Sequence, residues 1–280
     1  MSVEMKNSLH IEPVTGVIGA EISGIDLREQ ISETDLAALK GAWLEHQTLF
    51  FRDQELTIEQ HKALGRQFGE LHIHPAQHRN GLEGHPEILV VHADENTTRP
   101  AGDGWHSDVS CDPEPPMGSI LRLFEVPPTG GDKLFGSMYA AYEALSPEMK
   151  RYLGSLTATH DGGPNYIDRA KRSGHHDPNR VYPANSHPVV RTHPETGRKA
   201  IFVNPIFTTQ IDEVPKDEGQ AILDFLFAHI AKPQFQCRFR WRKNSVVFWD
   251  NRCTIHQAIW DYFPRVRSGH RVTIQGDKPY

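Results

Sequence analysis

The chain has 280 residues, of which 38% are hydrophobic and 24% are charged, and its formal net charge at neutral pH is −6. This length allows one large domain with a well-buried core, although the count alone would also allow two. The acidic balance and the lack of a long basic run give no sign of binding to nucleic acid or to an anionic membrane surface.

Four segments show the sequence features of helices. Ser32 is positioned as the N-cap of the first, in which Leu36, Leu39 and Trp43 recur at helical spacing. Thr57 and Gln60 fit the capping-box pattern at the start of the second. The four expected helices are residues 31–46, 57–68, 137–145 and 217–230.

Short runs rich in Val, Ile and Phe, bounded by Pro, Gly, Asn and Asp, indicate strands. Helices do not alternate regularly with them, which argues against a parallel doubly wound sheet. A mainly β fold with a few covering helices is therefore expected, as an antiparallel sandwich or jelly roll in one domain over residues 1–280. The expected strands are residues 88–92, 119–124, 199–203, 235–241, 245–249 and 271–275.

Residues 162–187 form a polar stretch that holds Gly, Pro, Asn, His and Arg. This composition predicts a long irregular loop. Because long loops in compact domains often cover functional sites, we expect this segment to be an active-site lid.

The cysteines and the hydropathy of the chain favour a cytoplasmic protein. Cys111, Cys237 and Cys253 are odd in number and widely spaced, so they do not suggest a disulfide framework, and a reducing compartment fits them best. Residues 1–16 lack the apolar centre of a signal peptide, and no apolar run approaches the length of a membrane span.

The motif Trp105-His106-Ser107-Asp108 is the strongest local signal of chemistry. Side chains two residues apart on an extended chain point to the same side, so His106 and Asp108 could bind one metal ion together. The segment WDNRCTIH supplies a third candidate ligand, His256. Two imidazoles and one carboxylate on one face leave open positions that suit iron(II) with a chelating cosubstrate and oxygen.

Other interpretations of these residues remain open at this stage. A His-x-Asp triplet alone is a weak signal, and zinc is a rival metal with Cys111 or Cys253 as further ligands. The pair His72 and His74 in LHIHP could equally be a satisfied surface pair.

Arg267 stands eleven residues beyond His256, within a cluster that also holds Arg265, His270 and Arg271. A dicarboxylate that chelates iron through one end leaves its other carboxylate buried, and arginine is the best bidentate partner for it. The cluster could also be a solvated charged stretch, but the adjacent strand-like VTIQ indicates that some of these side chains point inward.

Longer motifs resemble the 2-oxoglutarate-dependent taurine dioxygenase family. The resemblance covers nearly the whole chain, and it is specific because several separate motifs occur in the same order as in the family. The motifs include TGVIGAEISGIDL, FGELHIHP, WHSD, PPTGGDKLF, FWDNRCTIH and RSGHRVTIQGDKP. The resemblance implies a double-stranded β-helix, also called a jelly roll. It also implies that His106, Asp108 and His256 bind Fe(II) and that Arg267 holds the distal carboxylate of 2-oxoglutarate.

The implied reaction uses 2-oxoglutarate and O2, and it gives succinate, carbon dioxide and a hydroxylated substrate. In taurine dioxygenases the hydroxylated carbon bears the sulfonate, and the product breaks down to sulfite and an aldehyde. The iron supplies the oxidative chemistry while the protein orients and shields the reactants. His74 and Arg271 match the positions that grip the sulfonate, with Tyr166 and Phe207 as aromatic wall candidates.

Four positions depart from the family pattern. Lys133 replaces a threonine that contacts the cosubstrate, and this lysine could pair with the same carboxylate or extend toward the substrate. Gln77, Gly102 and Asn165 stand where the close taurine enzymes carry tyrosine, asparagine and serine. The iron and cosubstrate residues are thus retained, whereas the pocket for the amine end of taurine is changed.

Three functional hypotheses follow. The first is a dioxygenase acting on a small anionic sulfonate, such as taurine or another alkylsulfonate. The second keeps this chemistry but uses a carboxylate, an aryloxyalkanoate or an alkyl sulfate. The third is a metal-binding protein without turnover. Relatives of this type lead us to expect a homo-oligomer, either a dimer or a tetramer.

Overall fold

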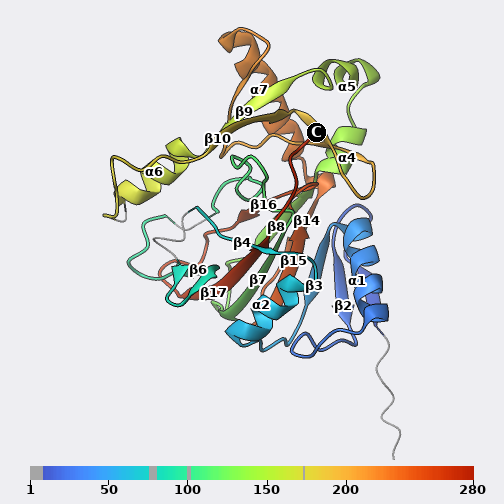
Figure 1. The fold of residues 1–280 in the computed structure, drawn as a ribbon, viewed down its shortest axis with the longest axis vertical. Coiled ribbons are helices and arrows are strands. Elements are labelled where there is room, and N and C mark those ends of the chain that lie inside the picture. The colour runs from blue at the N-terminus through green and yellow to red at the C-terminus, as the bar shows by residue number, and fades with distance from the viewer. Residues whose placement is uncertain (1–8, 76–80, 100–101, 173) are drawn as a thin grey trace, which may run out of the picture.

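The computed structural model describes residues 9–75, 81–99, 102–172 and 174–280 (Figure 1). Its helices are α1 (Glu33–His46), α2 (Ile58–Arg66), α4 (Met138–Glu143), α5 (Pro147–Leu153), α6 (Gly163–Arg172) and α7 (Lys216–Ile230), with a 3-10 turn at Pro233–Phe235. Its strands are β1 (His10–Pro13), β2 (Ala20–Ser23), β3 (Thr48–Phe51), β4 (Leu71–His72), β5 (Gly81–Leu82), β6 (His85–Ala93), β7 (Gly118–Glu125), β8 (Lys133–Ser137), β9 (Thr157–Asp161), β10 (Ala184–Pro188), β11 (Val190–Thr192), β12 (Lys199–Ile201), β13 (Thr208–Ile211), β14 (Gln236–Phe239), β15 (Ser245–Asp250), β16 (Thr254–Ala258) and β17 (Arg267–Ile274).

A large sheet forms the centre of the molecule. Its strand order is β1-β2-β3-β15-β7-β17-β6-β5, and β4 also pairs with β17. The β2–β3 pair is parallel, whereas β15 and β17 run antiparallel to β7 between them. A smaller antiparallel sheet has the order β14-β8-β16. The prediction of a mainly β fold with covering helices is therefore confirmed.

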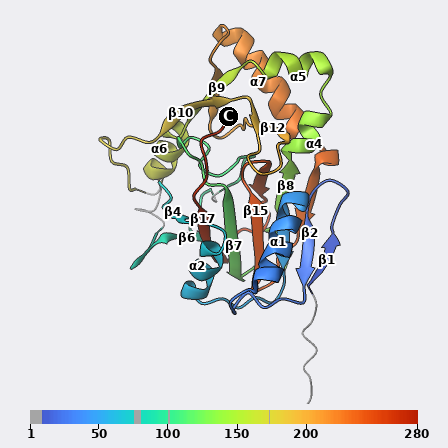
Figure 2. The same ribbon diagram turned by 45° about the vertical axis from the view of Figure 1, so that its right-hand side comes forward.

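Helices α1 and α2 cover one face of the large sheet (Figures 1 and 2). Both begin as the sequence predicts, because Ser32 accepts a hydrogen bond from the Asp35 amide and Thr57 forms a capping box with Gln60. The ring of Trp43 in α1 stacks on Phe248 of the sheet, with ring centres 4.3 Å apart. This contact fixes the first helix against the apolar face of the strands.

The small sheet packs against the opposite face. Alternation along β15 sends Val247 and Trp249 to this side and Phe248 to the helical side. Phe50 of the large sheet stacks on Phe239 of the small one, with ring centres 4.3 Å apart. The two sheets thus enclose an apolar core, and the active-site candidates lie between them beyond that core.

A third layer contains α4, α5 and α7 and the small sheet with order β10-β9-β13, and it lies at the top of Figure 1. Its core is a cluster to which α4, α5 and α7 contribute Tyr139, Leu153 and Leu226. The expected helices at 137–145 and 217–230 are confirmed as α4 and α7. Helix α5 was not predicted, although Ser146 caps it and Pro147 occupies its first turn.

The prediction of an irregular loop over 162–187 is wrong at both ends, where the segment forms α6 and β10. The side chain of Asp161 accepts a hydrogen bond from the Gly163 amide at 2.7 Å and begins the helix. Tyr166 and Ala170, four residues apart, form its buried stripe. Gly162, Gly163 and Pro164 resemble a loop in sequence, but they fit the first turn of a helix.

The sequence predicted no disulfide framework and no membrane-spanning segment, and the structure bears on both expectations. Cys111, Cys237 and Cys253 are all free, and all three are buried. Within the described ranges, no helix combines the length and the apolar character that a membrane crossing requires.

Candidate active site

Two segments far apart in sequence bring the predicted metal ligands together. The amide of His106 donates to the His256 carbonyl at 3.1 Å, and the His256 amide donates back to the His106 carbonyl at 2.8 Å. His256 lies on β16, where it pairs with Phe135 of β8, and Asp108 begins the turn that follows the short bridge. His106 therefore extends the small sheet by one bridge.

The three ligand atoms face one another in a buried space. Nε2 of His106 and Nε2 of His256 each lie 3.8 Å from Oδ1 of Asp108, close enough for one ion to contact all three side chains. Nδ1 of His106 donates to the Gly104 carbonyl at 2.7 Å, which leaves Nε2 as the free lone pair. Neither ring nitrogen of His256 has a hydrogen-bond partner among the described residues.

The protonation states of this group suit a divalent cation. Burial lowers the pKa of His106 to about 4 and holds the pKa of His256 well below its ordinary value. Burial alone would raise the pKa of Asp108, but Arg271 and the two histidines lower it below the ordinary aspartate value. Two neutral imidazoles beside a carboxylate are a donor set that fits iron(II).

A relay of hydrogen bonds orients the Asp108 carboxylate. Ser119 of β7 donates to Oδ2 of Asp108 at 2.7 Å, and Asn251 donates to the Ser119 hydroxyl at 2.9 Å. The indole of Trp249 donates to the Asn251 side-chain oxygen at 2.9 Å. Sequence reasoning missed these supporting residues, although Trp249 and Asn251 stand inside the FWDN motif that precedes His256.

Arg267 and Arg271 point to the same side of β17, because they are four positions apart on one strand and side chains alternate between its two sides. Strand geometry places them roughly 13 Å apart along the chain. Arg265 is exposed and donates to Thr129, and the His270 ring packs edge-on against Phe124. The prediction that only part of this basic cluster points inward is thus confirmed.

Arg271 approaches the metal candidates directly. Its Nη1 contacts Oδ1 of Asp108 at 2.5 Å, whereas its buried Nε has no hydrogen-bond partner among the described residues. Arg267 is buried and donates from Nε to the Gly131 carbonyl at 3.2 Å, but its buried Nη2 has no hydrogen-bond partner in the part of the chain that the structure describes. Unpaired buried guanidinium nitrogens are costly, which makes both arginines suited to hold an anion.

Lys133 is the third buried cation. It begins β8 opposite Ala258 of β16, and its Nζ lies 4.2 Å from the centre of the Trp249 ring. Burial holds its pKa well below the ordinary lysine value, and Arg271 and Arg267 act in the same direction against the attraction of Asp108.

These residues line one cavity of about 300 Å³. His74 faces Tyr166 edge-to-face with ring centres 6.0 Å apart, and the Phe207 ring packs against Tyr166 with ring centres 5.8 Å apart. Asn165 also lines the cavity, so every predicted site residue lies on its wall. Sequence reasoning missed two arginines of α6 that line it as well, Arg169 and Arg172.

Comparison with known proteins gives a consistent result. Residues 10–273 match the model of the family described as "Taurine catabolism dioxygenase TauD, TfdA family". The chain belongs to this family. An alpha-ketoglutarate-dependent sulfonate dioxygenase from Saccharomyces cerevisiae is 30% identical, over 99% of this chain and 69% of that protein. An alpha-ketoglutarate-dependent sulfate ester dioxygenase from Pseudomonas putida is 31% identical, over 97% and 91%.

A solved structure of a taurine dioxygenase from Burkholderia xenovorans is similar to this chain with a TM-score of 0.84 and 36% identity, over 97% of this chain and 92% of that one. The chain is thus a dioxygenase of the TauD/TfdA family that uses Fe(II), 2-oxoglutarate and O2 on a small anionic substrate. The hypothesis of a metal-binding protein without turnover is not supported.

Two positions that depart from the TauD/TfdA resemblance have a clear structural setting. Gly102 has a φ of +79°, and a Cβ there would come within 3.2 Å of the His106 ring, so any side chain at this position would stand over a candidate ligand. Lys133 occupies the cavity wall next to Arg267 and Arg271. Gln77, another of the four departures, lies outside the described residues.

The histidine pair in LHIHP divides into two roles. His72 is buried and contacts Oδ2 of Asp112 at 2.9 Å and the Thr273 hydroxyl at 3.3 Å, so it is a satisfied structural residue. His74 lines the cavity instead. Neither Cys111 nor Cys253 joins the ligand group of His106, which leaves the zinc alternative without a sulfur ligand at this site.

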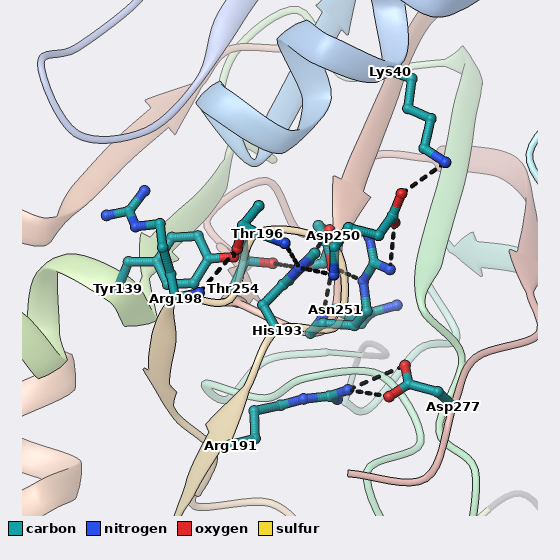
Figure 3. Close-up of polar contacts among 12 residues, drawn as sticks. Lys40, Tyr139, Arg191, His193, Thr196, Arg198, Asp250, Asn251, Thr254 and Asp277 are labelled. Atoms are coloured by element: carbon teal, nitrogen blue, oxygen red, sulfur yellow. Dashed lines mark hydrogen bonds and ion pairs between the residues drawn. The ribbon is translucent and has the colours of Figure 1, made fainter. Parts of the chain in front are cut away.

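A second group of ligand-type side chains lies outside the cavity and consists of His193, Asp250 and Cys253. Figure 3 shows His193 and Asp250 with their polar contacts. Here the donors are occupied. Nε2 of His193 donates to Asp250 at 3.0 Å, and its Nδ1 accepts backbone amides from Glu195 and Thr196 at 3.2 Å each. Arg252 donates to both oxygens of Asp250. This group is therefore a structural network and not a second metal site.

Proposed function

We propose that this chain oxidises a small organic sulfonate at the carbon that bears the sulfonate group. Its two facing sheets would form the double-stranded β-helix of the family. Fe(II) would be held by His106, Asp108 and His256, and it supplies the oxidation when bound. The observation that carries this proposal is the buried Nε2 atom of His256, which lies 3.8 Å from the Asp108 carboxylate and has no hydrogen-bond partner among the described residues.

The cosubstrate 2-oxoglutarate would bind with its distal carboxylate on Arg267. Its position on the cavity wall and its Nη2, which has no partner within the described ranges, support this role. Gly131 has a φ of +72° and its own Cβ would stand 3.3 Å from the Arg267 side chain, so the glycine lets the backbone carbonyl hold the guanidinium. Lys133 would add a second positive charge to the same end of the cavity.

The substrate sulfonate would be gripped by His74 and Arg271. Arg271 retains a buried donor that Asp108 does not use, and His74 lines the same cavity. Tyr166 and Phe207 would exclude water along the aromatic wall, and Asn165 would supply a polar contact. Residues 162–187 would cover this side of the site, since α6 contributes both Asn165 and Tyr166.

The balanced reaction would convert the sulfonate, 2-oxoglutarate and O2 to an α-hydroxysulfonate, succinate and carbon dioxide. The α-hydroxysulfonate would then eliminate hydrogen sulfite and leave an aldehyde. A second candidate is a sulfate ester, favoured by the 31% identity to the Pseudomonas putida relative. Hydroxylation of its O–CH carbon would give hydrogen sulfate and an aldehyde.

The decisive experiment is a substrate panel with Fe(II), ascorbate and 2-oxoglutarate. We expect succinate and sulfite in equal amounts from alkylsulfonates, and taurine as a weaker substrate because its ammonium would face cations of the cavity. Release of sulfate from alkyl sulfates without sulfite from any sulfonate would replace the first candidate by the second. Substrate-dependent succinate from carboxylates alone would contradict both.

Lys133→Ala tests the cosubstrate pocket. If Lys133 pairs with 2-oxoglutarate, the variant should bind the cosubstrate about tenfold more weakly, the effect of one charge-assisted contact, while the Kd of the substrate changes little. Anaerobic calorimetry on the Fe(II)-loaded protein measures both constants separately from turnover. Arg267→Gln is the matched comparison and should weaken cosubstrate binding more. A larger change in substrate Kd would place Lys133 on the substrate instead.

A further inference from the structure

We propose that Gly102 leaves an apolar space beside His106, and that this space receives a substituent on the reacting carbon of the substrate. The inference rests on the proposed function, which places the substrate sulfonate at His74 and Arg271. It extends the substrate class to sulfonates whose reacting carbon is bonded to two other carbons. These are secondary sulfonates, such as propane-2-sulfonate.

Backbone contacts fix Gly102 beside the candidate ligands. Its carbonyl accepts a hydrogen bond from the Ala258 amide at 2.7 Å, and Ala258 follows His256 by two residues on β16. His106 exchanges two backbone hydrogen bonds with His256 of the same strand. Gly102 also lines the cavity. It is therefore a fixed part of the cavity wall at the side of His106.

The backbone conformation alone does not require a glycine here. Gly102 has a φ of +79°, and asparagine is among the residues that adopt such left-handed conformations most readily. The asparagine of the close taurine enzymes would thus fit this position. What distinguishes the glycine is the missing side chain. A Cβ there would lie 3.2 Å from Cε1 and 3.7 Å from Nε2 of His106, beside the nitrogen that faces Asp108.

Apolar side chains adjoin this position. The Cβ of Ala258 lies 4.0 Å from the place that a Cβ of Gly102 would take. Ile206 packs on Gly104, two residues along the chain, so closely that a Cβ on Gly104 would come within 2.7 Å of its Cδ1. Ala258 and Ile206 both line the cavity. A methyl group gains free energy when it leaves water for such surroundings, whereas an ammonium group loses its hydration.

The sulfonate clamp and the space at Gly102 adjoin different candidate ligands. Arg271 contacts Asp108, whereas Gly102 stands beside His106. The carbon that loses a hydrogen atom must approach these ligands, and besides that hydrogen and the sulfonate it carries two further groups. One would follow the aromatic wall that includes Tyr166. The other would point to Gly102, as a hydrogen in a primary sulfonate and as a methyl group in a secondary one.

The reaction is balanced for such a substrate. Propane-2-sulfonate, 2-oxoglutarate and O2 would give 2-hydroxypropane-2-sulfonate, succinate and carbon dioxide. The hydroxylated product would eliminate hydrogen sulfite and leave acetone, whereas propane-1-sulfonate would leave propanal. The two substrates are isomers of equal charge, so a comparison between them isolates the branch at the reacting carbon.

The test compares the two isomers with the Fe(II)-loaded protein and 2-oxoglutarate, and sulfite release measures the rate for each. The unaltered protein should oxidise both compounds. G102N should lower the kcat/KM ratio of propane-2-sulfonate to propane-1-sulfonate about tenfold, the effect of one carbon on specificity in an apolar pocket. The different strengths of the two C–H bonds cancel, because the ratio is compared between variants. Anaerobic calorimetry should show the same selective loss in the Kd of propane-2-sulfonate.

A second variant and a matched control accompany G102N. A258V fills the same space from a β-strand and should lower the ratio in the same direction, so it decides the test if G102N no longer binds one Fe(II) per chain. G84N places the same side chain at a glycine with a similar φ of +76°, where a Cβ would have nothing within 4 Å. Gly84 is not among the described residues that line the cavity, so G84N should leave the ratio unchanged.

Two results would overturn the inference. One is a protein that oxidises propane-1-sulfonate but not propane-2-sulfonate. The other is an unchanged ratio in both G102N and A258V, and a weaker Kd for 2-oxoglutarate in these variants would then assign the space to the cosubstrate. If neither isomer releases sulfite, the proposed function has failed, and anaerobic calorimetry tests the space separately. A selective loss of affinity for propane-2-sulfonate in the variants would then support it, whereas an equal change for both isomers, or no binding of either, would contradict it.

Discussion

Two groups of buried histidine, aspartate and neighbouring side chains lie among the described residues, and they differ in how many of their polar atoms have hydrogen-bond partners. In each, the candidate ligand atoms lie within 4.8 Å of one another. In the His193 network, both oxygens of Asp250 and both nitrogens of His193 have partners within the protein (Figure 3). In the cavity, both ring nitrogens of His256 have none among the described residues.

This difference separates a binding site from a structural network. A buried polar atom without a partner costs roughly 1–3 kcal/mol, so a fold retains several of them together where a ligand completes them. The His256 nitrogens and the Arg267 and Arg271 guanidinium atoms form such a set on one cavity wall. Proximity of ligand-type residues alone would have ranked the two groups equally.

The largest expected effect is on the cavity group. His106→Ala should remove one ligand, abolish stoichiometric Fe(II) binding and lower kcat by more than the roughly 100-fold that loss of an outer-shell contact costs. Anaerobic calorimetry with Fe(II) and a succinate assay measure the two effects independently.

The matched control for that change is His193→Ala, which removes another buried histidine, one that belongs to the structural network. We expect one metal ion per folded chain in this variant, as in the unaltered protein. Full succinate formation by His106→Ala, or loss of metal binding in His193→Ala with the fold intact, would reverse the assignment of the two groups.

A second prediction concerns the contribution of the His193 network to the free energy of unfolding. Asp250→Asn leaves the buried Arg252 without its main counter-charge, and Glu195 supplies only one remaining carboxylate, at 2.7 Å from Nη1. Removal of one partner from a buried ion pair costs about 3–5 kcal/mol. Urea unfolding should show this loss, while the metal stoichiometry of the folded fraction stays at one. A change below about 1 kcal/mol, the range of exposed pairs, would show that the network contributes little.

Local sequence patterns were sufficient for some elements of this fold. Ser32, Thr57 and Gln60 lie within a few residues of the amides that they cap, so α1 and α2 could be predicted closely. Helix α6 could not, because its buried stripe is only Tyr166 and Ala170. Tyr166 is buried in a cluster with Phe207 and Cys111, which are distant in the sequence.

The same distinction applies to the site. The predicted ligands His106, Asp108 and His256 do lie together, because the motif spacing and the family resemblance carry that information. The contact between Asp108 and Arg271 joins residues 163 positions apart. The α6 arginines reach the cavity because their segment is helical, whereas its sequence predicts a loop. Such contacts follow from the packing of layers and not from any local pattern.

The smallest predicted effect concerns the pH dependence of stability. It comes from His61, a buried histidine whose partner is a neutral carbonyl, whereas the partner of His193 is a carboxylate. His61 bonds to the Ile120 carbonyl, and burial lowers its pKa to about 3. The unfolded chain, with an ordinary value near 6.5, takes up a proton first as the pH falls, so stability decreases with falling pH between these two values. The slope reaches about 1.4 kcal/mol per pH unit for each such histidine. Urea midpoints of metal-free protein at pH 7, 6 and 5 should therefore fall less steeply in His61→Gln, whose amide can still donate to Ile120, than in a control His175→Gln at an exposed position. Identical slopes in the two variants would show that His61 accepts a proton inside the fold.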